Sequence, residues 1–319
     1  MTIAGKYTIA LEEHYYDPEL AATFDGPEGR ATEIRRRLDD LGDLRIREMD
    51  ESGIDLQVIS HGAPSTQRLD AQTAVRLARG ANDRLHQAVL RHPDRFAAFA
   101  ALPTPDPKAS ADELERTVKE FGFKGAMVHG LTNGVFFDDK RFWPIMAKAA
   151  ELDVPIYLHP AVPDPRVVEA YYKDYLADFP GILTAAWGFT METATAGMRM
   201  VLSGAFDAYP NLKIILGHMG EGLPFLLWRI NMALQRPGNK KVNFQEQFSR
   251  NVYITTSGNF STPALLCRML EMGIDHILYS VDYPFVLNPP GTKWMEELQV
   301  SAEDKEKILS GNAKRLLRI

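Results

Sequence analysis

Eight short runs of β-type residues recur along the chain, and stretches with the apolar spacing of helices lie between most of them. This alternation predicts βα units and a parallel sheet, which makes the chain an α/β protein. The strand-like runs are residues 7–11, 56–60, 96–101, 125–128, 154–158, 213–217, 252–256 and 276–280. The clearest helical stretches are residues 71–91, 110–121, 141–152, 191–207, 223–235 and 262–272.

Eight βα units in 319 residues fit a closed (β/α)8 TIM barrel, a fold that commonly takes about 250 residues or more. An open, doubly wound sheet is the alternative. It is disfavoured because no glycine-rich phosphate loop follows the first strand, and residues 217–222 lack the glycine spacing of a dinucleotide loop. No linker or low-complexity tract divides the sequence. We therefore predict one barrel domain over residues 1–319.

Two connections are longer than a barrel requires. Residues 15–44 leave the first strand through Gly26-Pro27 and a charged helix, and residues 160–186 are rich in tyrosine, proline and aspartate. Loops that follow barrel strands lie at the C-terminal face, where barrel enzymes hold their active sites. We expect both loop insertions to cover this face.

Charge and composition argue against some classes of binding partner. The formal net charge is −6, and the basic run at residues 35–37 is interpreted as an exposed helix face. This balance argues against nucleic acid or an anionic membrane surface as the main partner. No stretch reaches the roughly 18 apolar residues of a membrane span, and residues 1–9 lack the apolar core of a secretion signal. We expect a cytoplasmic protein whose single cysteine, Cys267, packs in the core.

Metal-ligand residue types stand at or just after the ends of the predicted strands. They are Glu12, His14, His61, His129, His159, His218 and Asp282. Alternation along a strand places Glu12 and His14 on one face and turns Glu13 aside. Together with His159 and Asp282 they supply two imidazoles and two carboxylates, a set that suits one Zn²⁺ or Mn²⁺ ion and leaves positions open for substrate.

Longer motifs surround these positions. They are Glu12-x-His14 and residues 157–160, 216–224, 254–260 and 280–285, with further similarity through residues 44–53, 91–102 and 311–316. In these motifs the chain resembles the decarboxylase branch of the amidohydrolase superfamily, and most closely the γ-resorcylate (2,6-dihydroxybenzoate) decarboxylases. Hydrolytic relatives usually begin with a His-x-His pair. Glutamate in the first position, with the long motif after His218, therefore favours decarboxylation.

The resemblance implies roles for individual residues. Glu12, His14, His159 and Asp282 would bind the metal, and His218 would lie beside it with Glu221 behind. The spacing supports the last pair independently, because a carboxylate three residues after His218, at a strand-to-helix turn, could orient the imidazole. The candidates for substrate binding are Trp187 and Phe285 as an aromatic wall, Arg229, and the strand-end histidines His61 and His129.

The chain is thus expected to be a metal-dependent, non-oxidative carboxy-lyase that acts on a small ortho-hydroxybenzoic acid, reversibly, without an organic cofactor. Asp282 is predicted to donate the proton, assisted by His218. A lactonase-type hydrolase with Asp282 as general base is the alternative, and a non-catalytic barrel is a third possibility. By resemblance, a homodimer or homotetramer is expected.

Several positions depart from the pattern of the resorcylate enzymes. Tyr283 stands where those enzymes carry tryptophan, and His61 and His129 stand where asparagine-like or apolar residues are expected. The loop at residues 15–44 is also shorter. These departures bear on the identity of the aromatic acid substrate more than on the type of reaction.

Overall fold

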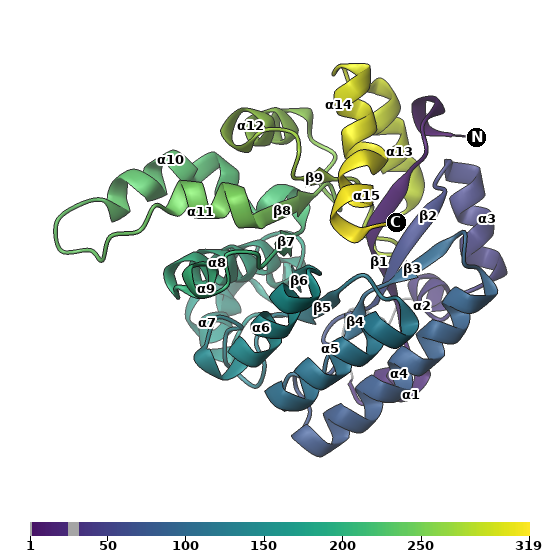
Figure 1. Cartoon of the computed structure of the whole chain (residues 1–319), viewed down its shortest axis with the longest axis horizontal. Helices are drawn as coiled ribbons and strands as arrows, with labels where there is room; N and C mark the ends of the chain where they lie inside the picture. The colour runs from purple at the N-terminus through teal and green to yellow at the C-terminus, as the bar shows by residue number, and fades with distance from the viewer. Residues whose placement is uncertain (1, 25–31) are drawn as a thin grey trace.

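The computed structural model describes residues 2–24 and 32–319, and shows parallel strands surrounded by helices (Figure 1). The predicted exit of the first connection through Gly26-Pro27 lies outside the described residues. The strands are β1 Ile9–Tyr15, β2 Leu56–His61, β3 Phe96–Ala98, β4 Ala100–Ala101, β5 Ala126–His129, β6 Ile156–His159, β7 Ile214–Leu216, β8 Val252–Thr255 and β9 Ile277–Leu278.

Neighbouring strands are parallel and follow the order of the sequence, in a sheet β1-β2-β3 and a sheet β4 to β9. The predicted run 96–101 forms both β3 and β4, because the Phe99 N–H donates to Ile59 of β2 whereas the Ala100 N–H donates to Gly125, next to β5. Across the other seam, the Leu11 N–H donates to the Tyr279 carbonyl oxygen at 3.2 Å. The fold is the predicted (β/α)8 barrel, with its third strand divided between two hydrogen-bonding partners.

Several helices begin at a side-chain cap. The helices are α1 Pro18–Ala21, α2 Thr32–Leu38, α3 Asp43–Ser52, α4 Ala71–Arg91, α5 Pro107–Phe121, α6 Trp143–Leu152, α7 Pro165–Val167, α8 Gly188–Leu202, α9 Ala205–Ala208, α10 Leu223–Leu234, α11 Phe244–Asn251, α12 Thr262–Met272, α13 Asn288–Glu297, α14 Ala302–Glu306 and α15 Asn312–Leu317. Asp70, Asp106 and Ser261 cap α4, α5 and α12 by accepting hydrogen bonds from backbone amides of the first turn. None of the helices in the described residues has the length and apolar character of a membrane span.

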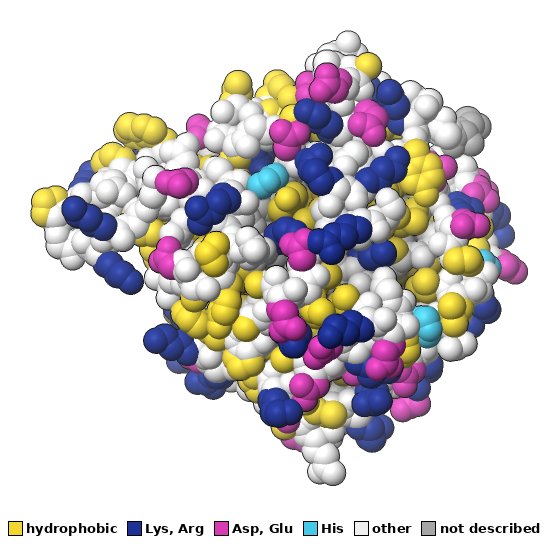
Figure 2. Space-filling view, in the orientation of Figure 1, with side chains coloured by type: hydrophobic (Ala, Val, Ile, Leu, Met, Phe, Trp, Pro, Cys, Tyr) yellow, Lys and Arg dark blue, Asp and Glu magenta, His cyan; other side chains and the backbone are white. Residues whose placement is uncertain are grey.

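The surface carries charges of both signs. On the face shown in Figure 2, Lys and Arg side chains are interspersed with Asp and Glu. Hydrophobic side chains lie on the arm that α10 and α11 form at the left of Figures 1 and 2.

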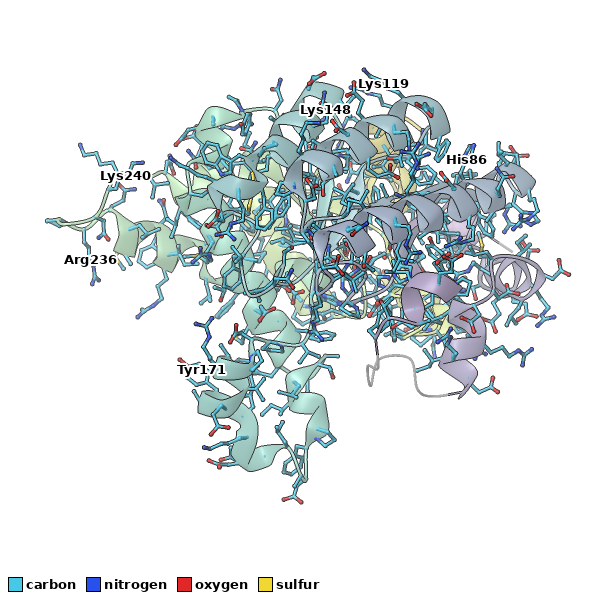
Figure 3. All side chains as sticks on the ribbon, turned by 90° about the horizontal axis from the view of Figure 1, so that it is seen from below. His86, Lys119, Lys148, Tyr171, Arg236 and Lys240 are labelled. Atoms are coloured by element: carbon cyan, nitrogen blue, oxygen red, sulfur yellow. The ribbon has the colours of Figure 1, made fainter. Side chains whose placement is uncertain are left out.

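The connection at residues 160–186 is more helical than a simple loop. It contains α7 and three short helical turns, Val168–Tyr172, Lys173–Tyr175 and Pro180–Leu183. This insertion, marked by Tyr171, projects from the body in Figure 3, whereas Arg236 and Lys240 mark the end of the α10–α11 arm. Residues from both ends of the insertion, Pro160 and Ala185, reach the cavity described below.

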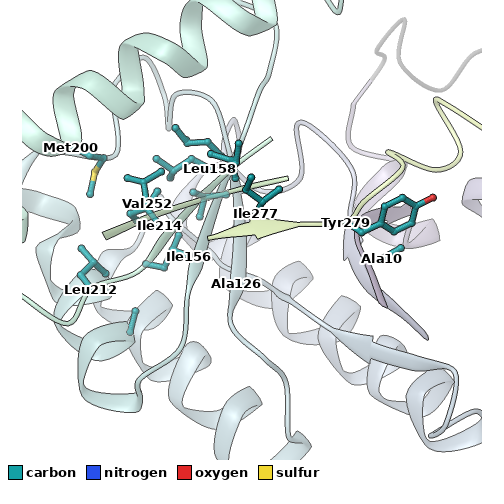
Figure 4. Packing of buried hydrophobic residues seen from close by; sticks show 14 of the residues in the cluster. Ala10, Ala126, Ile156, Leu158, Met200, Leu212, Ile214, Val252, Ile277 and Tyr279 are labelled. Carbon is teal, nitrogen blue, oxygen red and sulfur yellow. The ribbon is translucent and has the colours of Figure 1, made fainter. Parts of the chain in front are cut away.

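Apolar side chains form two main layers around the strands. One cluster joins residues such as Leu11, Phe99 and Met127 with Leu316 of the C-terminal helix. The other packs the opposite strand faces against the surrounding helices, as Ile156 and Ile214 do beside Met200 of α8 (Figure 4). Because successive side chains of a strand alternate between the two layers, the sequence phase of each strand determines which of its residues face the inside.

Candidate metal centre

Strand β1 carries a bulge at the first candidate ligand. Ala10 pairs with Gln57 and Glu13 pairs with Ile59, so that Leu11 and Glu12 together oppose a single residue of β2. Glu12 has a left-handed backbone with φ of 58°. Since Leu11 belongs to the inner cluster, strict alternation would have turned Glu13 inward and Glu12 outward. The bulge shifts this alternation by one residue, so that Glu12 and His14 both face inward and Glu13 faces outward.

The four predicted metal ligands converge at the C-terminal ends of β1, β6 and β9. Glu12, His14, His159 and Asp282 each offer one ligand atom, and these atoms lie within 4.8 Å of one another. Glu12 Oε1 is 3.3 Å from His159 Nε2, and His14 Nε2 is 3.3 Å from Asp282 Oδ1. Glu12 and His14 are completely buried.

The unsatisfied atoms of this cluster fit a divalent cation. Glu12 Oε1, His14 Nε2 and Asp282 Oδ1 are buried and have no hydrogen-bond partner among the described residues. Buried polar atoms without a partner destabilise a fold by roughly 1–3 kcal/mol each, which a bound ion would offset. His159 Nδ1 lies 2.7 Å from the Pro160 carbonyl oxygen, so that nitrogen carries the proton and the Nε2 lone pair faces the cluster.

The second oxygen of Glu12 is held by three hydroxyl groups. Tyr157 and Ser257 donate hydrogen bonds to Oε2, and Thr255 Oγ1 lies 3.2 Å from the same oxygen. Burial raises the pKa of Glu12, while the positive charge of His218 opposes that rise. These hydroxyl residues were not among the predicted site residues. Tyr157 could have been found, because it precedes His159 by two residues on the same strand face.

Glu221 holds His218 as the spacing suggested. His218 Nδ1 is 2.7 Å from Glu221 Oε1, and Thr190 donates a hydrogen bond of 2.8 Å to the other carboxylate oxygen. His218 Nε2 faces Glu12 Oε1 at 3.6 Å and Asp282 Oδ2 at 3.8 Å. Burial alone would lower the pKa of His218, but the charges of Glu221 and Glu12 raise it well above its ordinary value. The imidazole is therefore oriented with its Nε2 toward the metal centre.

Asp282 also has a left-handed backbone, with φ of 77°. Burial works to raise the pKa of its carboxyl group, but the neighbouring imidazoles of His14 and His218 outweigh burial and hold the pKa below its ordinary value. Among the protein groups alone, the proton of the pair thus resides on His218 and Asp282 is ionised. The predicted proton donor must therefore receive its proton from a neighbour before it can donate one.

A cavity of about 230 Å³ opens beside the metal centre. It is lined by Ile34, Ala63, His159, Pro160, Thr184, Ala185, Phe189, His218, Asp282 and Phe285. The lining is apolar except for Thr184 and the residues of the centre, as expected of a pocket that holds a small ring and directs its polar groups to one side. Both predicted insertions contribute to it.

The predicted aromatic wall is only partly present in the described lining. Phe285 lines the cavity, and its ring centroid is 5.6 Å from that of His14. Trp187 is 50% exposed and lies outside the lining, because it precedes the first turn of α8 and the helix turns Phe189 toward the cavity instead. Arg229 is exposed on α10 and also lies outside it.

The two remaining candidates, His61 and His129, are buried beside the centre and are not part of the cavity lining. His61 stacks on Tyr16 with ring centroids 5.4 Å apart, and its Nδ1 is 2.8 Å from the Gly62 carbonyl oxygen. The ring of His129 is 5.0 Å from that of His159. Burial lowers the pKa of His61 to about 4 and that of His129 well below its ordinary value, so both imidazoles are neutral. His129 therefore packs as a neutral group against His159, whereas His61 packs among Tyr15, Tyr16 and Phe24.

Comparison with known proteins agrees with this geometry. The sequence profile of the amidohydrolase family matches residues 14–319. Over 327 residues the chain is 41% identical to the gamma-resorcylate decarboxylase of Polaromonas sp. strain JS666, with 98% of each protein covered.

Two solved structures extend the comparison. The dihydroxybenzoic acid decarboxylase of Polaromonas sp. JS666, with bound manganese and the inhibitor 2-nitroresorcinol, superposes with a TM-score of 0.90 at 41% identity, over 98% of this chain and 97% of that one. The 5-carboxyvanillate decarboxylase of Novosphingobium aromaticivorans, with manganese and 4-hydroxy-3-methoxy-5-nitrobenzoic acid, gives 0.91 at 31% identity, over 99% and 97%.

Proposed function

The chain belongs to the amidohydrolase family, and from this membership and the metal centre we propose that it is a metal-dependent, non-oxidative decarboxylase of an ortho-hydroxybenzoic acid. The reaction releases CO₂ and a phenol and runs in both directions. One observation carries the proposal: the unpartnered ligand atoms of Glu12, His14 and Asp282 converge beside a small apolar cavity. The decarboxylases among the relatives support it.

We propose manganese as the resident ion. Both solved relatives named above hold manganese, and the mixed imidazole and carboxylate set also accepts zinc. Glu12, His14, His159 and Asp282 would hold the ion, which would supply Lewis-acid chemistry by polarising oxygen atoms of the substrate. No organic cofactor is part of the proposal.

The side chains around the cavity would move one proton. Direct loss of CO₂ from an aromatic ring would leave an unstable carbanion, so the carboxyl-bearing carbon must gain a proton before its bond to the carboxylate breaks. Asp282 lines the cavity and would deliver this proton, which His218 supplies from its Nε2. When the C–C bond breaks, its electron pair returns to the ring and restores aromaticity. Glu221 keeps the imidazole in place throughout.

The cavity limits the substrate to a single ring of modest size. Phe189 and Phe285 offer apolar contacts to its faces and edges. A hydroxyl group ortho to the carboxylate would complete a chelate at the centre, whereas a meta or para hydroxyl cannot reach the same position. Because relatives act on dihydroxybenzoic acid and on 5-carboxyvanillate, substituents on the far side of the ring distinguish the candidate substrates.

The test is a matched panel of ortho-, meta- and para-hydroxybenzoates, with 2,6- and 2,3-dihydroxybenzoate and 5-carboxyvanillate, incubated with the manganese-loaded protein. Chromatography of the phenol and measurement of CO₂ follow the reaction. We expect turnover of ortho-hydroxy acids only, with discrimination on the order of 10⁴-fold against acids that lack the hydroxyl. Comparable turnover of the para-only acid would overturn the chelation mechanism. Protein treated with a chelator is the control.

A lactonase-type hydrolase remains the alternative in the same family. In that case Asp282 would act as general base on a water molecule, and no carbon would be lost. Glutamate at position 12 and the decarboxylases among the relatives favour the lyase. Hydrolysis of a lactone without CO₂ release from any acid in the panel would support the hydrolase.

We further propose that the protein is a cytoplasmic homodimer or homotetramer of one-domain chains. Support for assembly comes from large apolar side chains exposed on α10 and α12, where Phe225 is 79%, Trp228 68% and Leu270 87% exposed. A second copy is the natural cover for such a surface. Light scattering after size-exclusion chromatography should give a dimer or tetramer, and Phe225→Glu with Leu270→Glu should shift it toward the monomer.

A further inference from the structure

Glu13 lies between the two metal ligands of β1. Its side chain faces away from the cavity and forms hydrogen bonds with a different part of the chain. Its side chain is completely buried. Oε1 accepts a hydrogen bond of 3.0 Å from the Val281 N–H and lies 3.2 Å from the Ser280 hydroxyl oxygen. Oε2 accepts a hydrogen bond of 3.2 Å from the Tyr283 N–H. One carboxylate thus binds the backbone on both sides of Asp282.

The same segment is joined to β1 through the main chain. The His14 N–H donates to the Tyr283 carbonyl oxygen at 2.7 Å, and the Ser280 hydroxyl donates to the Leu11 carbonyl oxygen. Glu13 therefore completes a set of contacts between the strand that carries two ligands and the segment that carries the fourth.

The buried cation Arg45 is linked to Glu13 through Gln57. Gln57 Nε2 is 3.5 Å from Glu13 Oε2, and its carboxamide oxygen accepts a hydrogen bond of 3.2 Å from Arg45 Nη1. Another guanidinium nitrogen of Arg45 donates to the His14 carbonyl oxygen, and the group lies 4.8 Å from the centre of the Tyr283 ring. Arg45 and Gln57 are completely buried. All the hydrogen-bonding neighbours of the Glu13 carboxylate are donors. Burial raises the pKa of Glu13 to about 8, while the Val281 amide and the charge of Arg45 oppose that rise.

Asp282 needs this support, because its left-handed backbone is unfavourable for a residue with a side chain. Such a conformation persists only where the surroundings fix it. The hydrogen bonds that the Val281 and Tyr283 N–H groups donate to Glu13 fix the backbone on both sides of Asp282.

We propose that Glu13 is a positioning residue that sets the metal affinity of the centre by holding Asp282 in place against Glu12 and His14. The inference deepens the proposed function and rests on its metal centre. Glu13 touches neither the cavity nor the four ligand atoms, so its effect passes through the backbone. A residue that only supports the fold would change stability without changing the affinity for the metal.

The experiment measures Mn²⁺ binding by calorimetry and the unfolding temperature of the metal-free protein for Glu13→Gln and Glu13→Asp. In Glu13→Gln the new side-chain NH₂ group would face the Tyr283 N–H or Gln57. Two hydrogen-bond donors would then oppose each other, and the hydrogen bond would be lost. In Glu13→Asp the shorter side chain withdraws the carboxylate from the amides. We expect Mn²⁺ affinity to fall by about 10- to 100-fold in both, as for other groups that orient metal ligands.

Glu48→Gln is the matched control. Glu48 Oε2 accepts a hydrogen bond of 2.7 Å from the Tyr283 hydroxyl, so this carboxylate contacts the same segment through a side chain and not through the backbone beside Asp282. We expect its Mn²⁺ affinity to equal that of the wild type.

The outcomes are separable. Folded Glu13→Gln with Mn²⁺ affinity within threefold of the wild type overturns the inference, as does an equal loss in Glu48→Gln. Failure of both Glu13 variants to fold assigns Glu13 to general support and overturns it too. Wild-type protein that binds Mn²⁺ but decarboxylates no hydroxybenzoate refutes the proposed function alone, and leaves the role of Glu13 in metal binding to be decided by the calorimetry.

Discussion

Tyr157 donates its hydroxyl hydrogen to Oε2 of Glu12, and so leaves Oε1 of the same carboxylate free to face the histidines of the metal centre. Ser257 and Thr255 donate to the same Oε2. Three donors on one oxygen favour the ionised carboxylate and fix its plane. This division leaves Oε1 as the one oxygen of Glu12 that is available to a metal ion.

Tyr157→Phe should therefore weaken metal binding. Removal of one of three donors frees Glu12 to rotate, and we expect Mn²⁺ affinity to fall by about tenfold while the ring continues to fill its place in the core. Calorimetric titration with Mn²⁺ measures the change. Tyr253→Phe, on strand β8 of the same sheet but stacked on His276, should bind Mn²⁺ as the wild type does. Unchanged affinity in Tyr157→Phe would show that the other hydroxyls suffice.

Gly217→Ala tests the same carboxylate by steric means. A Cβ atom at Gly217 would lie 3.0 Å from Glu12 Oε2, 3.1 Å from Oε1 and 3.1 Å from the Tyr157 hydroxyl oxygen. The carboxylate would have to move, at a cost of about 1–3 kcal/mol, and Mn²⁺ content after dialysis should drop. Gly42→Ala is the control, because a Cβ atom there meets nothing within 4 Å. Full Mn²⁺ occupancy in Gly217→Ala would mean that the site adapts without loss.

Asp282→Asn should retain the metal and lose turnover. The amide oxygen can still approach the ion, but the group cannot receive a proton from His218 and pass it to the ring. Loss of a positioned acid typically lowers kcat by about 10²- to 10⁴-fold. Steady-state kinetics on the best ortho-hydroxybenzoate, with Mn²⁺ content measured on the same sample, separates lost chemistry from lost metal. Turnover within tenfold of the wild type would exclude Asp282 as the acid.

The sequence predicted the barrel and the convergence of the ligands because both follow from local patterns. The β-type runs and the positions of Glu12, His159 and Asp282 near strand ends need no knowledge of partners. The reason given for pairing Glu12 with His14 was incomplete. Alternation gives their common side, but its inward direction depends on a bulge, and a bulge is defined by register against β2, which one strand's pattern cannot reveal.

Side-chain direction near helix ends was harder to predict. Trp187 and Phe189 are two residues apart, and the starting residue of α8 decides which of them turns toward the cavity. Helix boundaries are uncertain by one or two residues, which is enough to exchange the two. The role of Glu13 depends on contacts with residues 280–283, more than 260 positions away, so the sequence showed only that it would turn aside.

A buried carboxyl group outside the metal centre should make stability depend on pH. Glu192 of α8 is 8% exposed, its Oε2 accepts a hydrogen bond of 3.2 Å from the Asp164 N–H, and its Oε1 has no partner among the described residues. Burial, only partly opposed by that N–H, raises the pKa of Glu192 to about 8 from an ordinary 4.5. Between these values the folded protein binds more protons than the unfolded chain. The contribution of neutral Glu192 is thus fully present below about pH 4.5 and is lost as the pH rises through about 8.

Glu192→Gln should remove this dependence, because glutamine has the same shape and does not titrate. We compare the unfolding temperature of the variant minus that of the wild type at two pH values. This difference should be a few degrees larger at pH 9 than at pH 6, because only the wild type must ionise a buried group over that range. Differential scanning calorimetry of both metal-free proteins at constant ionic strength measures the difference. Glu296→Gln, on an exposed position of α13, should follow the wild type at both pH values. Parallel curves for Glu192→Gln and the wild type would mean that Glu192 ionises in the folded protein without cost.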